Sequence, residues 1–336
     1  MPSRRTRYLQ LLAISLPGLI SLPLIAGFFG EVHPAFDSFA HFRAHLAALL
    51  AVSALAPLAV GFWKEAAASV VLAIAALSTT AVDLPIPGLG AVAADQHPGD
   101  RAVYRLLQLN LLFNNPEPEK ALSVIGRTQP DVITLNEVSE MWQARLEPLA
   151  ASYPYRLFCM APRRIGGVAI LSRRPFVDAA RPYCFSNGRY AVARVDLGGS
   201  AIDVAALHLN WPWPYDQAGE IEQVTREFSG LSDNTLLAGD FNAAGWSAAV
   251  THVMEAGGFV RVPPIGPTWL DSSLPASLRD YVGLPIDHVL VKGLVQVHSV
   301  AKAGDAGSDH APVLVEFSVA AKGAPGEAST ALAMWK

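Results

Sequence analysis

Hydrophobic positions are distributed unevenly along this chain, and two patterns follow one another. The first part contains three long apolar segments, at 9–29, 39–63 and 66–82. The first two are long enough to cross a bilayer as helices of about 20 residues, and the third reaches that length if it continues through 84–89. Prolines within the first two segments are tolerated in transmembrane helices and costly in soluble ones. The pattern therefore predicts a membrane anchor of three transmembrane helices in residues 1–83.

Charged residues near these segments predict the orientation of the anchor. Basic side chains precede the first segment and lie in the loop before the third, whereas acidic side chains lie in the loop between the first two: Arg4, Arg5, Arg7 and Lys64 against Glu31 and Asp37. The positive-inside rule then predicts a multi-pass protein of the cytoplasmic (inner) membrane, with the chain after the third segment on the periplasmic or extracellular side. A cleaved signal peptide is the alternative for the first segment, but two further apolar segments argue against simple secretion.

Composition separates the two parts of the chain. Hydrophobic residues make up 51% of the 336 residues and charged residues only 16%. Basic and acidic side chains balance in residues 1–99, so the net charge of −4 lies in residues 100–336. The proline-rich stretch 84–101 is predicted to be a linker, and 320–336 a flexible tail. So short a linker would hold the following domain within reach of the bilayer.

From residue 104 onward the pattern changes to short β-like segments separated by turns. Strands are predicted at 104–109, 131–135, 155–160, 168–172, 191–197, 201–207, 235–238, 286–291 and 311–317, and helices at 118–128, 217–231 and 248–256. Many antiparallel-looking strands with a few interposed helices predict an α+β fold, a two-sheet β-sandwich flanked by helices. The predicted domain occupies residues 102–319.

Polar residues recur at the ends of the predicted strands. The apolar run 236–238 stops at Gly239 and is followed by Asp240 and Asn242, which point to one side of an extended chain while Phe241 points to the other. Five further strands carry an acid, amide or imidazole at one end: Asn110, Glu137, His208, Asp287 and Ser308-Asp309-His310. If these ends share one edge of the sandwich, they form a single acidic cleft that contains histidine. Each group alone could equally be an ordinary turn or strand end.

The ordered set of these motifs resembles the endonuclease/exonuclease/phosphatase superfamily, which includes pancreatic deoxyribonuclease, apurinic endonucleases, sphingomyelinases and inositol polyphosphate phosphatases. The resemblance extends from residue 105 to residue 317 and includes a strand at 167–173. It implies a deoxyribonuclease-like sandwich and hydrolysis of phosphoester bonds. The apolar segments resemble a membrane-anchored bacterial subgroup, which includes glycopeptide-resistance proteins thought to act on lipid-linked pyrophosphates.

A metal ion is part of this expectation. Phosphoester hydrolysis needs a cation to offset the charge on the phosphate, and Mg²⁺ prefers carboxylate oxygens and retained waters. Glu137 is the first choice as metal ligand, with Asn110 and Asp309 beside it. Mn²⁺ is the alternative ion. Whether one metal or two act stays open.

The other strand-end residues are predicted to carry the chemistry. His310 could take a proton from water or stabilise the phosphate, and the resemblance implies that Asp287 orients it. Asp240 would align or deprotonate the attacking water, and Asn242 and His208 would donate hydrogen bonds to phosphoryl oxygens. The predicted enzyme is thus a Mg²⁺-dependent hydrolase that cleaves a phosphate ester or pyrophosphate bond, with a membrane-proximal lipid as candidate substrate.

Two other functions were weighed against this one. An endonuclease or exonuclease on the outer face of the membrane would normally carry a basic surplus, and residues 100–336 carry a net negative charge, so nucleic acid is a disfavoured partner. A non-catalytic membrane-anchored binding domain is disfavoured because every polar strand end is present. Neither the substrate nor the oligomeric state follows from the sequence.

A few residues outside these motifs leave alternatives open. Cys159 and Cys184 lie in β-like segments of a domain predicted to be outside the cytoplasm, so they form either a disulfide or two buried thiols. The stretch 211–214 (Trp-Pro-Trp-Pro) is either a wall of the cleft or a loop that dips into the headgroup layer. Three further features have simpler interpretations: His288 as packing, Arg163-Arg164 and Arg173-Arg174 as solvated loop charges, and His41, Arg43 and His45 as residues that reach the membrane interface.

Overall fold

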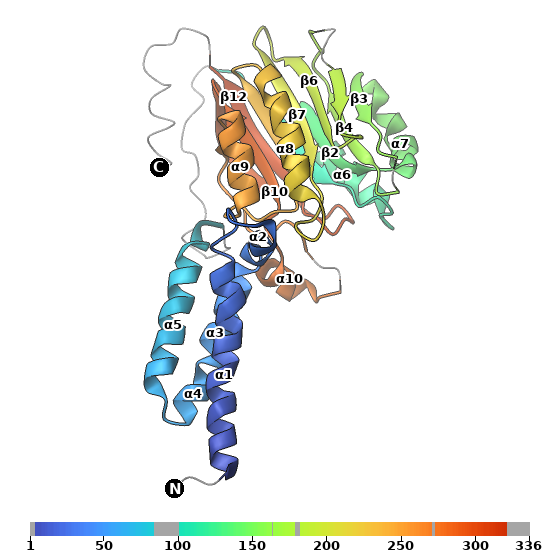
Figure 1. Ribbon diagram of the computed structural model, residues 1–336. Coiled ribbons are helices and arrows are strands. Elements are labelled where there is room, and N and C mark those ends of the chain that lie inside the picture. The colour runs from blue at the N-terminus through green and yellow to red at the C-terminus, as the bar shows by residue number, and fades with distance from the viewer. Residues whose placement is uncertain (1–3, 84–100, 163, 179–181, 271–272, 321–336) are drawn as a thin grey trace.

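The protein consists of a helical unit and a β-sandwich domain that lies at one end of it (Figure 1). The computed structural model describes residues 4–83, 101–162, 164–178, 182–270 and 273–320. The predicted linker lies outside the described residues except for Arg101, as does the predicted tail except for Ala320. The helical unit is residues 4–83, and the sandwich domain begins at residue 101.

Two β-sheets form the sandwich, as predicted. Each sheet is mixed and has six strands among the described residues. The first has the order β11-β12-β1-β2-β4-β3 and the second the order β5-β6-β7-β8-β10-β9. Their strands are β1 (Tyr104–Asn110), β2 (Val132–Val138), β3 (Tyr155–Cys159), β4 (Gly167–Ser172), β5 (Pro182–Phe185), β6 (Tyr190–Asp196), β7 (Ala201–His208), β8 (Thr235–Asp240), β9 (Val260–Arg261), β10 (Asp287–Lys292), β11 (Val295–Lys302) and β12 (Val313–Val319).

Helices cover the outer face of each sheet, so the domain has four layers (Figure 1). The first sheet is covered by α6 (Pro118–Thr128), α7 (Glu140–Leu146) and the 3-10 helix Glu147–Ala151. The second sheet is covered by α8 (Gln217–Glu227), the 3-10 helix Phe228–Gly230 and α9 (Ala248–Gly257). Helix α10 (Ala276–Val282) lies beside the helical unit. Helix α6 buries Ala121, Val124 and Ile125, an i, i+3, i+4 stripe that packs on Leu107 and Ile133 of the sheet. Removing these apolar faces from water stabilises the layers.

Strand register brings the polar strand ends together. Strands β1 and β2 are parallel, with Asn110 opposite Asn136. Strands β7 and β8 are also parallel, with His208 opposite Asp240, and antiparallel β10 places Asp287 opposite Asp240. The core between the two sheets consists of the apolar side chains that these strands point toward each other, including Leu106, Val204 and Leu236. The carboxyl ends of β1, β2, β7 and β8 therefore meet the amino end of β10.

The helical unit exposes apolar side chains. Its elements are α1 (Arg4–Ala26), α2 (Pro34–Ala40), α3 (Arg43–Ser53), α4 (Leu55–Ala59), α5 (Trp63–Ser78) and the 3-10 helix Ala81–Asp83. Small residues such as Ala47, Ala73 and Ala76 are buried between the helices, where they permit close packing. Outward residues include Leu12, Leu19, Val52, Leu55, Val71 and Ile74, all more than half exposed. This inside-out arrangement is typical of helices that lie in lipid.

The expectation of three transmembrane helices is corrected. Within the described residues only α1 is by itself long and apolar enough to span a membrane. The second apolar segment is broken between Ala40 and Arg43, where its two parts bend by 64°, so it counts as a span only if the bent pair is one unit. The third forms a helix of 16 residues that ends at Ser78 and gives way to a 3-10 turn. Length and composition thus support one spanning helix, or two.

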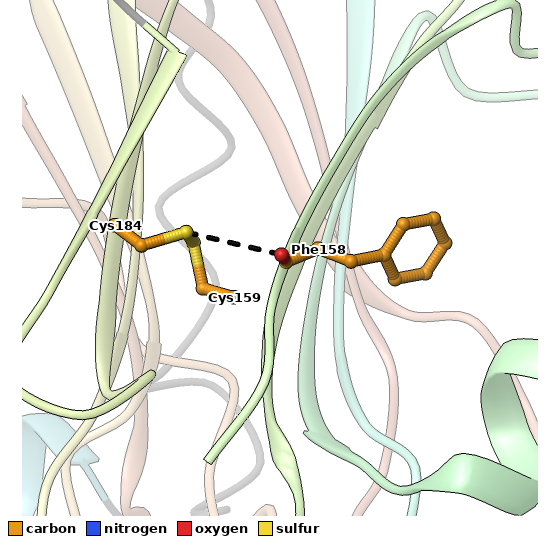
Figure 2. The surroundings of a disulfide bond; sticks show 3 residues. All are labelled: Phe158, Cys159 and Cys184. Carbon is orange, nitrogen blue, oxygen red and sulfur yellow. Dashed lines mark hydrogen bonds between the residues drawn. A yellow bond between two sulfur atoms is a disulfide. The ribbon is translucent and has the colours of Figure 1, made fainter.

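A disulfide joins Cys159 of β3 to Cys184 of β5 (Figure 2). The two Cα atoms are 5.4 Å apart, within the range that a disulfide requires. These strands lie at the edges of different sheets, so the bond ties the two layers of the sandwich together. Of the two alternatives for the cysteines, the structure shows the disulfide.

The disulfide should contribute measurably to stability. It closes a loop with a sequence separation of 25 residues, for which loop-closure entropy predicts about 3 kcal/mol. The double variant Cys159→Ala/Cys184→Ala is therefore expected to lower the thermal unfolding midpoint by several degrees. The control is wild-type protein treated with a thiol reductant, which should show the same loss. An unchanged midpoint in both would show that the bond does not stabilise the fold.

Candidate active site

The buried side chain of Asn136 connects the two sheets where the polar strand ends meet. Its Oδ1 accepts hydrogen bonds from Gln108 Nε2 (3.1 Å) and from the backbone nitrogen of Asp240 (2.9 Å), and its Nδ2 donates to the carbonyl of Leu207 (2.9 Å). Asn136 and Gln108 belong to the first sheet, and Leu207 and Asp240 to the second. These bonds hold the strand ends of both sheets in one constellation.

Two carboxylates flank the amide of Asn110. Its Nδ2 donates to Glu137 Oε1 at 3.1 Å and to Asp240 Oδ2 at 2.9 Å, while its Oδ1 accepts from the nitrogen of Leu112. Glu137 is further held by the backbone nitrogen of Phe113, 2.8 Å from Oε2. In this orientation Asn110 presents its nitrogen to the carboxylates and bridges them.

The backbone at Glu137 is unusual for a strand. The pairing of β2 with β4 shifts register between Leu135 and Val138, which is a β-bulge, and Glu137 has a φ of 57°. A left-handed conformation is uncommon for a residue with a side chain, and such residues concentrate at functional sites. The bulge turns Glu137 into the cleft beside Asn110 instead of onto the opposite face of the sheet.

His310 and Asp287 form a buried pair. His310 Nδ1 lies 2.8 Å from Asp287 Oδ2, and because an ionised carboxylate only accepts, Nδ1 carries the hydrogen. Gln108 donates to the other carboxylate oxygen at 3.0 Å, and the backbone nitrogen of Asp287 donates to Thr268 Oγ1. The second ring nitrogen of His310 is 3.7 Å from Asp240 Oδ2. Asp287 thus fixes the ring so that Nε2 faces Asp240.

His208 and Asn242 also contact Asp240. His208 Nε2 lies 3.7 Å from Asp240 Oδ2. The backbone nitrogen of Asn242 donates to Asp240 Oδ1 at 2.8 Å, and the Asn242 side chain donates to the carbonyl of Leu209. Asn242 has a φ of 48°, a second left-handed residue at a strand end. Asp240 is therefore surrounded by two imidazoles and two amides.

Asp309 is held by a tryptophan. Trp269 Nε1 donates to Asp309 Oδ2 at 3.2 Å, and the Trp269 ring packs edge-to-face on Trp211 at 5.9 Å. Ser308 donates to the carbonyl of Asn110 at 2.7 Å, which fixes this segment beside β1. Trp211 therefore lies next to the side chain that positions Asp309.

Burial and charge set the protonation of the central groups. Burial raises the pKa of Asp240 to about 7, although the nearby His310 opposes the shift. For His310, burial alone would lower the pKa, but the charges of Asp287 and Asp240 outweigh it and raise the pKa to about 10. Burial would raise the pKa of Asp287, but the His310 charge and its hydrogen bonds lower it. At neutral pH His310 is therefore an imidazolium bound to an ionised Asp287.

Burial and neighbouring charges also shift the pKa values of His208 and Glu137. Burial, with the positive charges of Arg189 and His310, lowers the pKa of His208 to about 3, so this imidazole is neutral. Burial raises the pKa of Glu137, and the charge of Asp309 adds to the shift. Two acids with raised pKa values, both bonded to Asn110, indicate a site that a cation would stabilise.

Two groups of side chains could hold a metal ion. Asp240, Asp287 and His310 offer ligand atoms that all lie within 4.8 Å of one another. There, however, the hydrogen on His310 Nδ1 already satisfies Asp287, and a metal would have to displace it. Glu137 and Asp309 interact electrostatically and are partly exposed to solvent. Their oxygens suit a hard divalent cation, so the donor chemistry favours this second pair.

Some residues singled out in the sequence lie outside this constellation. His288 donates from Nε2 to the carbonyl of Ala243 at 2.7 Å and packs on Phe241, consistent with a packing role. Arg173 lies over the ring of Tyr153, and Arg174 pairs with Asp131 at 3.0 Å. Both arginines follow Ser172, at the end of β4 opposite to the cleft, so they do not face it.

Four residues that support the site lie outside the predicted motifs. Gln108 and Asn136 lie within apolar strands, although a buried polar residue in such a strand signals a side-chain network. Thr268 and Trp269 precede β10 in a segment without a regular pattern. Only the folded chain reveals that they contact Asp287 and Asp309.

Comparison with known proteins places this arrangement in a family. Residues 107–310, more than half of the chain, match the Endonuclease/Exonuclease/phosphatase family. The chain therefore belongs to this family. Its members are generally hydrolases that act on phosphoester bonds, and they typically depend on a divalent metal ion.

Individual relatives are distant. UPF0294 proteins of Vibrio vulnificus strains YJ016 and CMCP6 are each 33% identical over 129 residues, which is 36% of this chain and 41% of the relative. The match thus spans less than half the length of these curated relatives. Among solved structures, an endonuclease/exonuclease/phosphatase protein from Beutenbergia cavernae has a TM-score of 0.52 at 22% identity, covering 65% of this chain and 72% of that one. D. rerio TDP2, solved with a single-strand DNA product, has a TM-score of 0.53 at 16% identity, covering 65% and 100%. These structures share the fold.

Proposed function

We propose that this protein is a membrane-attached, divalent-metal-dependent phosphoesterase that cleaves a phosphate ester or pyrophosphate bond in a substrate at the membrane surface. The observation that carries the proposal is the buried His310–Asp287 pair, whose second ring nitrogen lies 3.7 Å from Asp240, with His208 and Asn242 also in contact with Asp240. We propose that Glu137 and Asp309, whose charges interact, bind the divalent cation at this site. Phosphoryl transfer to water needs these three functions together: charge compensation, an oriented proton acceptor and oriented donors.

Each residue has a role in the proposed reaction. Asp240, with its pKa near neutrality, aligns the attacking water and takes its proton as the new P–O bond forms and the bond to the leaving group breaks. The His310 imidazolium, held by Asp287, stabilises the phosphoryl oxygens. His208 is neutral and donates one hydrogen bond, and Asn242 donates through its amide.

Glu137 and Asp309 would hold the cation, with Asn110 beside them. Mg²⁺ is the proposed ion because the donors are hard oxygens, and Mn²⁺ is the alternative. When bound, the ion offsets negative charge on the phosphate. The protein's own contribution is to keep the two carboxylates in place through Phe113 and Trp269.

The membrane part of the proposal rests on the helical unit. Helix α1 has 23 residues, a length of about 35 Å, which is sufficient for the hydrocarbon core of about 30 Å. The start of α1 and the connection from α4 to the first turn of α5 lie at the end of the helical unit that is distant from the sandwich domain (Figure 1). These parts of the chain contain Arg4, Arg5, Arg7 and Lys64. The positive-inside rule then places the sandwich domain on the periplasmic or extracellular side, and the disulfide suits that oxidising compartment. We propose that the other helices pack against α1 within the membrane.

Exposed aromatic residues support a substrate at the membrane surface. Trp213 and Tyr215 are more than half exposed, and the carbonyl of Trp213 accepts a hydrogen bond from Ser38 of the helical unit. Tyr281 of α10 is 73% exposed, and the neighbouring carbonyl of Val282 is 2.9 Å from His45 Nε2. Aromatic side chains at this junction would lie at the level of the headgroups. Trp211, in contact with Trp269, would form the adjacent wall of the cleft, so both interpretations of the 211–214 stretch enter the proposal.

The test is hydrolysis by the full chain in nanodiscs, with Mg²⁺ or Mn²⁺ and with EDTA as the control. The substrates are bis(p-nitrophenyl) phosphate, single-stranded DNA, a phospholipid and a polyprenyl pyrophosphate in the same discs. We expect metal-dependent cleavage that is fastest on a lipid-embedded substrate. Preferential cleavage of DNA would make the protein a nuclease instead, a function that the net charge of −4 disfavours. Metal binding without any cleavage would indicate a binding domain and contradict the proposal.

A further inference from the structure

The helical unit contacts the sandwich domain at the segment that follows the strand of Asp240. Residues 241–247 connect β8 to α9, and the first turn of α9 lies against α2. Asp37 of α2 is only 5% exposed. Its two carboxylate oxygens accept hydrogen bonds from the backbone nitrogens of Ala248 (2.8 Å) and Ala249 (3.0 Å). A residue of the helical unit therefore caps a helix of the sandwich domain.

This cap acts together with a local one. The first N–H groups of a helix have no partner within the helix, and a carboxylate at that end also interacts favourably with the helix dipole. Ser247, the residue before α9, accepts from the nitrogen of Val250 at 3.3 Å. Asp37 serves the two preceding nitrogens. Asp37 of α2 and Ser247 thus fix the start of α9 together.

Further contacts hold the same segment. Trp246 Nε1 donates to the carbonyl of Ala40 at 2.6 Å, and a buried ion pair joins Arg261 to Asp83 at the end of the helical unit. Arg261 lies directly against Gly245, where a Cβ atom would overlap its guanidinium group. The 243–247 segment therefore lies between the sandwich domain and two parts of the helical unit, α2 and Asp83.

The 243–247 segment continues directly from the active-site residues. Asn242 precedes Ala243, whose carbonyl is fixed by His288, and the Asn242 nitrogen in turn donates to Asp240 Oδ1. Asn242 adopts a left-handed φ of 48°, a conformation that persists only where the surroundings hold it. A shift of the start of α9 would therefore be transmitted to Asn242 and to the carboxylate of Asp240.

We propose that the docked helical unit is part of the catalytic apparatus, and that Asp37 is a positioning residue that holds Asp240 and Asn242 in place through the start of α9. The inference rests on the proposed function and adds to it a role for the membrane part beyond attachment. The alternative is that Asp37 only stabilises the junction between the two units. The alternatives differ in whether turnover by correctly folded protein depends on Asp37.

The experiment compares variants of the full chain in nanodiscs. Asp37→Ala removes both hydrogen bonds from Asp37 to α9, and Asp37→Asn retains one acceptor oxygen. Gly30→Ala leaves Asp37 in the chain but displaces it, because a Cβ atom at Gly30 would lie 2.5 Å from Asp37 Oδ1. Glu31→Ala is the matched control: Glu31 also contacts α9, through His252 at 2.5 Å, but this pair is exposed and lies away from the start of the helix.

Two readouts are measured, with thermal unfolding to confirm the fold. On bis(p-nitrophenyl) phosphate, we expect Asp37→Ala to lower kcat about tenfold with less than about a twofold change in KM, because small displacements of reacting groups are costly. Asp37→Asn should lie between it and the wild type, Gly30→Ala should shift in the same direction, and Glu31→Ala should match the wild type. Hydrogen exchange of the amides of Ala248, Ala249 and Asn242 should accelerate in Asp37→Ala.

The two readouts separate failure of this inference from failure of the proposed function. Unchanged kcat in folded Asp37→Ala, or faster exchange confined to α9, would overturn the positioning role and leave only stabilisation. If the wild type cleaves no phosphoester, the proposed function fails, and exchange alone then decides the inference: acceleration that reaches Asn242 supports it, and acceleration limited to Ala248 and Ala249 overturns it.

Discussion

Replacement of Glu137 by Gln should abolish turnover, with kcat lower by about a thousandfold or more, while the protein stays folded. The substitution keeps the shape of the side chain and one acceptor oxygen for Asn110 or Phe113. It removes the negative charge that would attract the cation. Glu137 also lies at a bulge at the rim of the sandwich and not in its core. The measurement is kcat with saturating Mg²⁺, together with thermal unfolding.

His310→Ala should have an effect of the same size, because it removes the imidazolium from the side of Asp240. The matched control is Glu140→Gln, three residues beyond Glu137 and exposed at the start of α7, which should behave like the wild type. Turnover near the wild-type rate in either Glu137→Gln or His310→Ala would show that the site has been assigned to the wrong residues.

A milder but pH-dependent loss is expected for Asp287→Asn. In the wild type the charges of Asp287 and Asp240 raise the pKa of His310 to about 10 against the effect of burial. An amide at position 287 removes the nearer charge and can donate to Nδ1, so burial prevails and the pKa falls. If the imidazolium is the active form, activity disappears as pH rises through this pKa. The alkaline limb of the variant's kcat profile should therefore move to lower pH, with a loss of about ten- to a hundredfold at neutral pH.

The profile should be measured from about pH 5 to pH 10, with Asp196→Asn as the control. Asp196 accepts from the backbone nitrogen of Gly199 in the turn between β6 and β7, at the end of these strands opposite to His208. Its removal should leave the profile unchanged. An alkaline limb at the same pH in Asp287→Asn would contradict the protonated state assigned to His310. A shift of the acidic limb alone would indicate that the neutral imidazole acts as a base.

Contact between the two units changes how the membrane attachment is understood. The length of the predicted linker indicated only that the sandwich domain stays near the bilayer. The structure shows direct contacts, with Asp37, Ala40 and Asp83 all bonded to the sandwich domain. These contacts fix the orientation of the sandwich domain relative to the helical unit. The proposed substrate at the membrane surface and the proposed role of Asp37 both depend on this orientation.

Regular elements were predicted best where the pattern and the packing agree. The helix at 118–128 coincides with α6, and the strand at 155–160 differs from β3 by one residue. Strands β5 and β11 were missed. Both are half-exposed strands at the edges of their sheets, where few buried positions mark a strand. The short helices α7 and α10 were also missed, because seven residues give too few turns for a clear helical period.

Local pattern in the chain is sufficient to predict the candidate site residues and a sandwich of two sheets. Polar residues that follow apolar runs are visible in the chain, because burial of a strand excludes such residues until the strand ends. Their convergence was decided by the register of β1, β2, β7, β8 and β10, which depends on pairing between distant segments. The same holds for the network around Asn136 and for the contact of Asp37 with α9. The apolar segments likewise predict helices whose outward side chains are apolar. The break before Arg43 and the end of α5 at Ser78, however, reduce the three expected membrane spans to one or two. Local pattern records what each residue prefers, whereas sites and interfaces arise from long-range contacts that no local pattern contains.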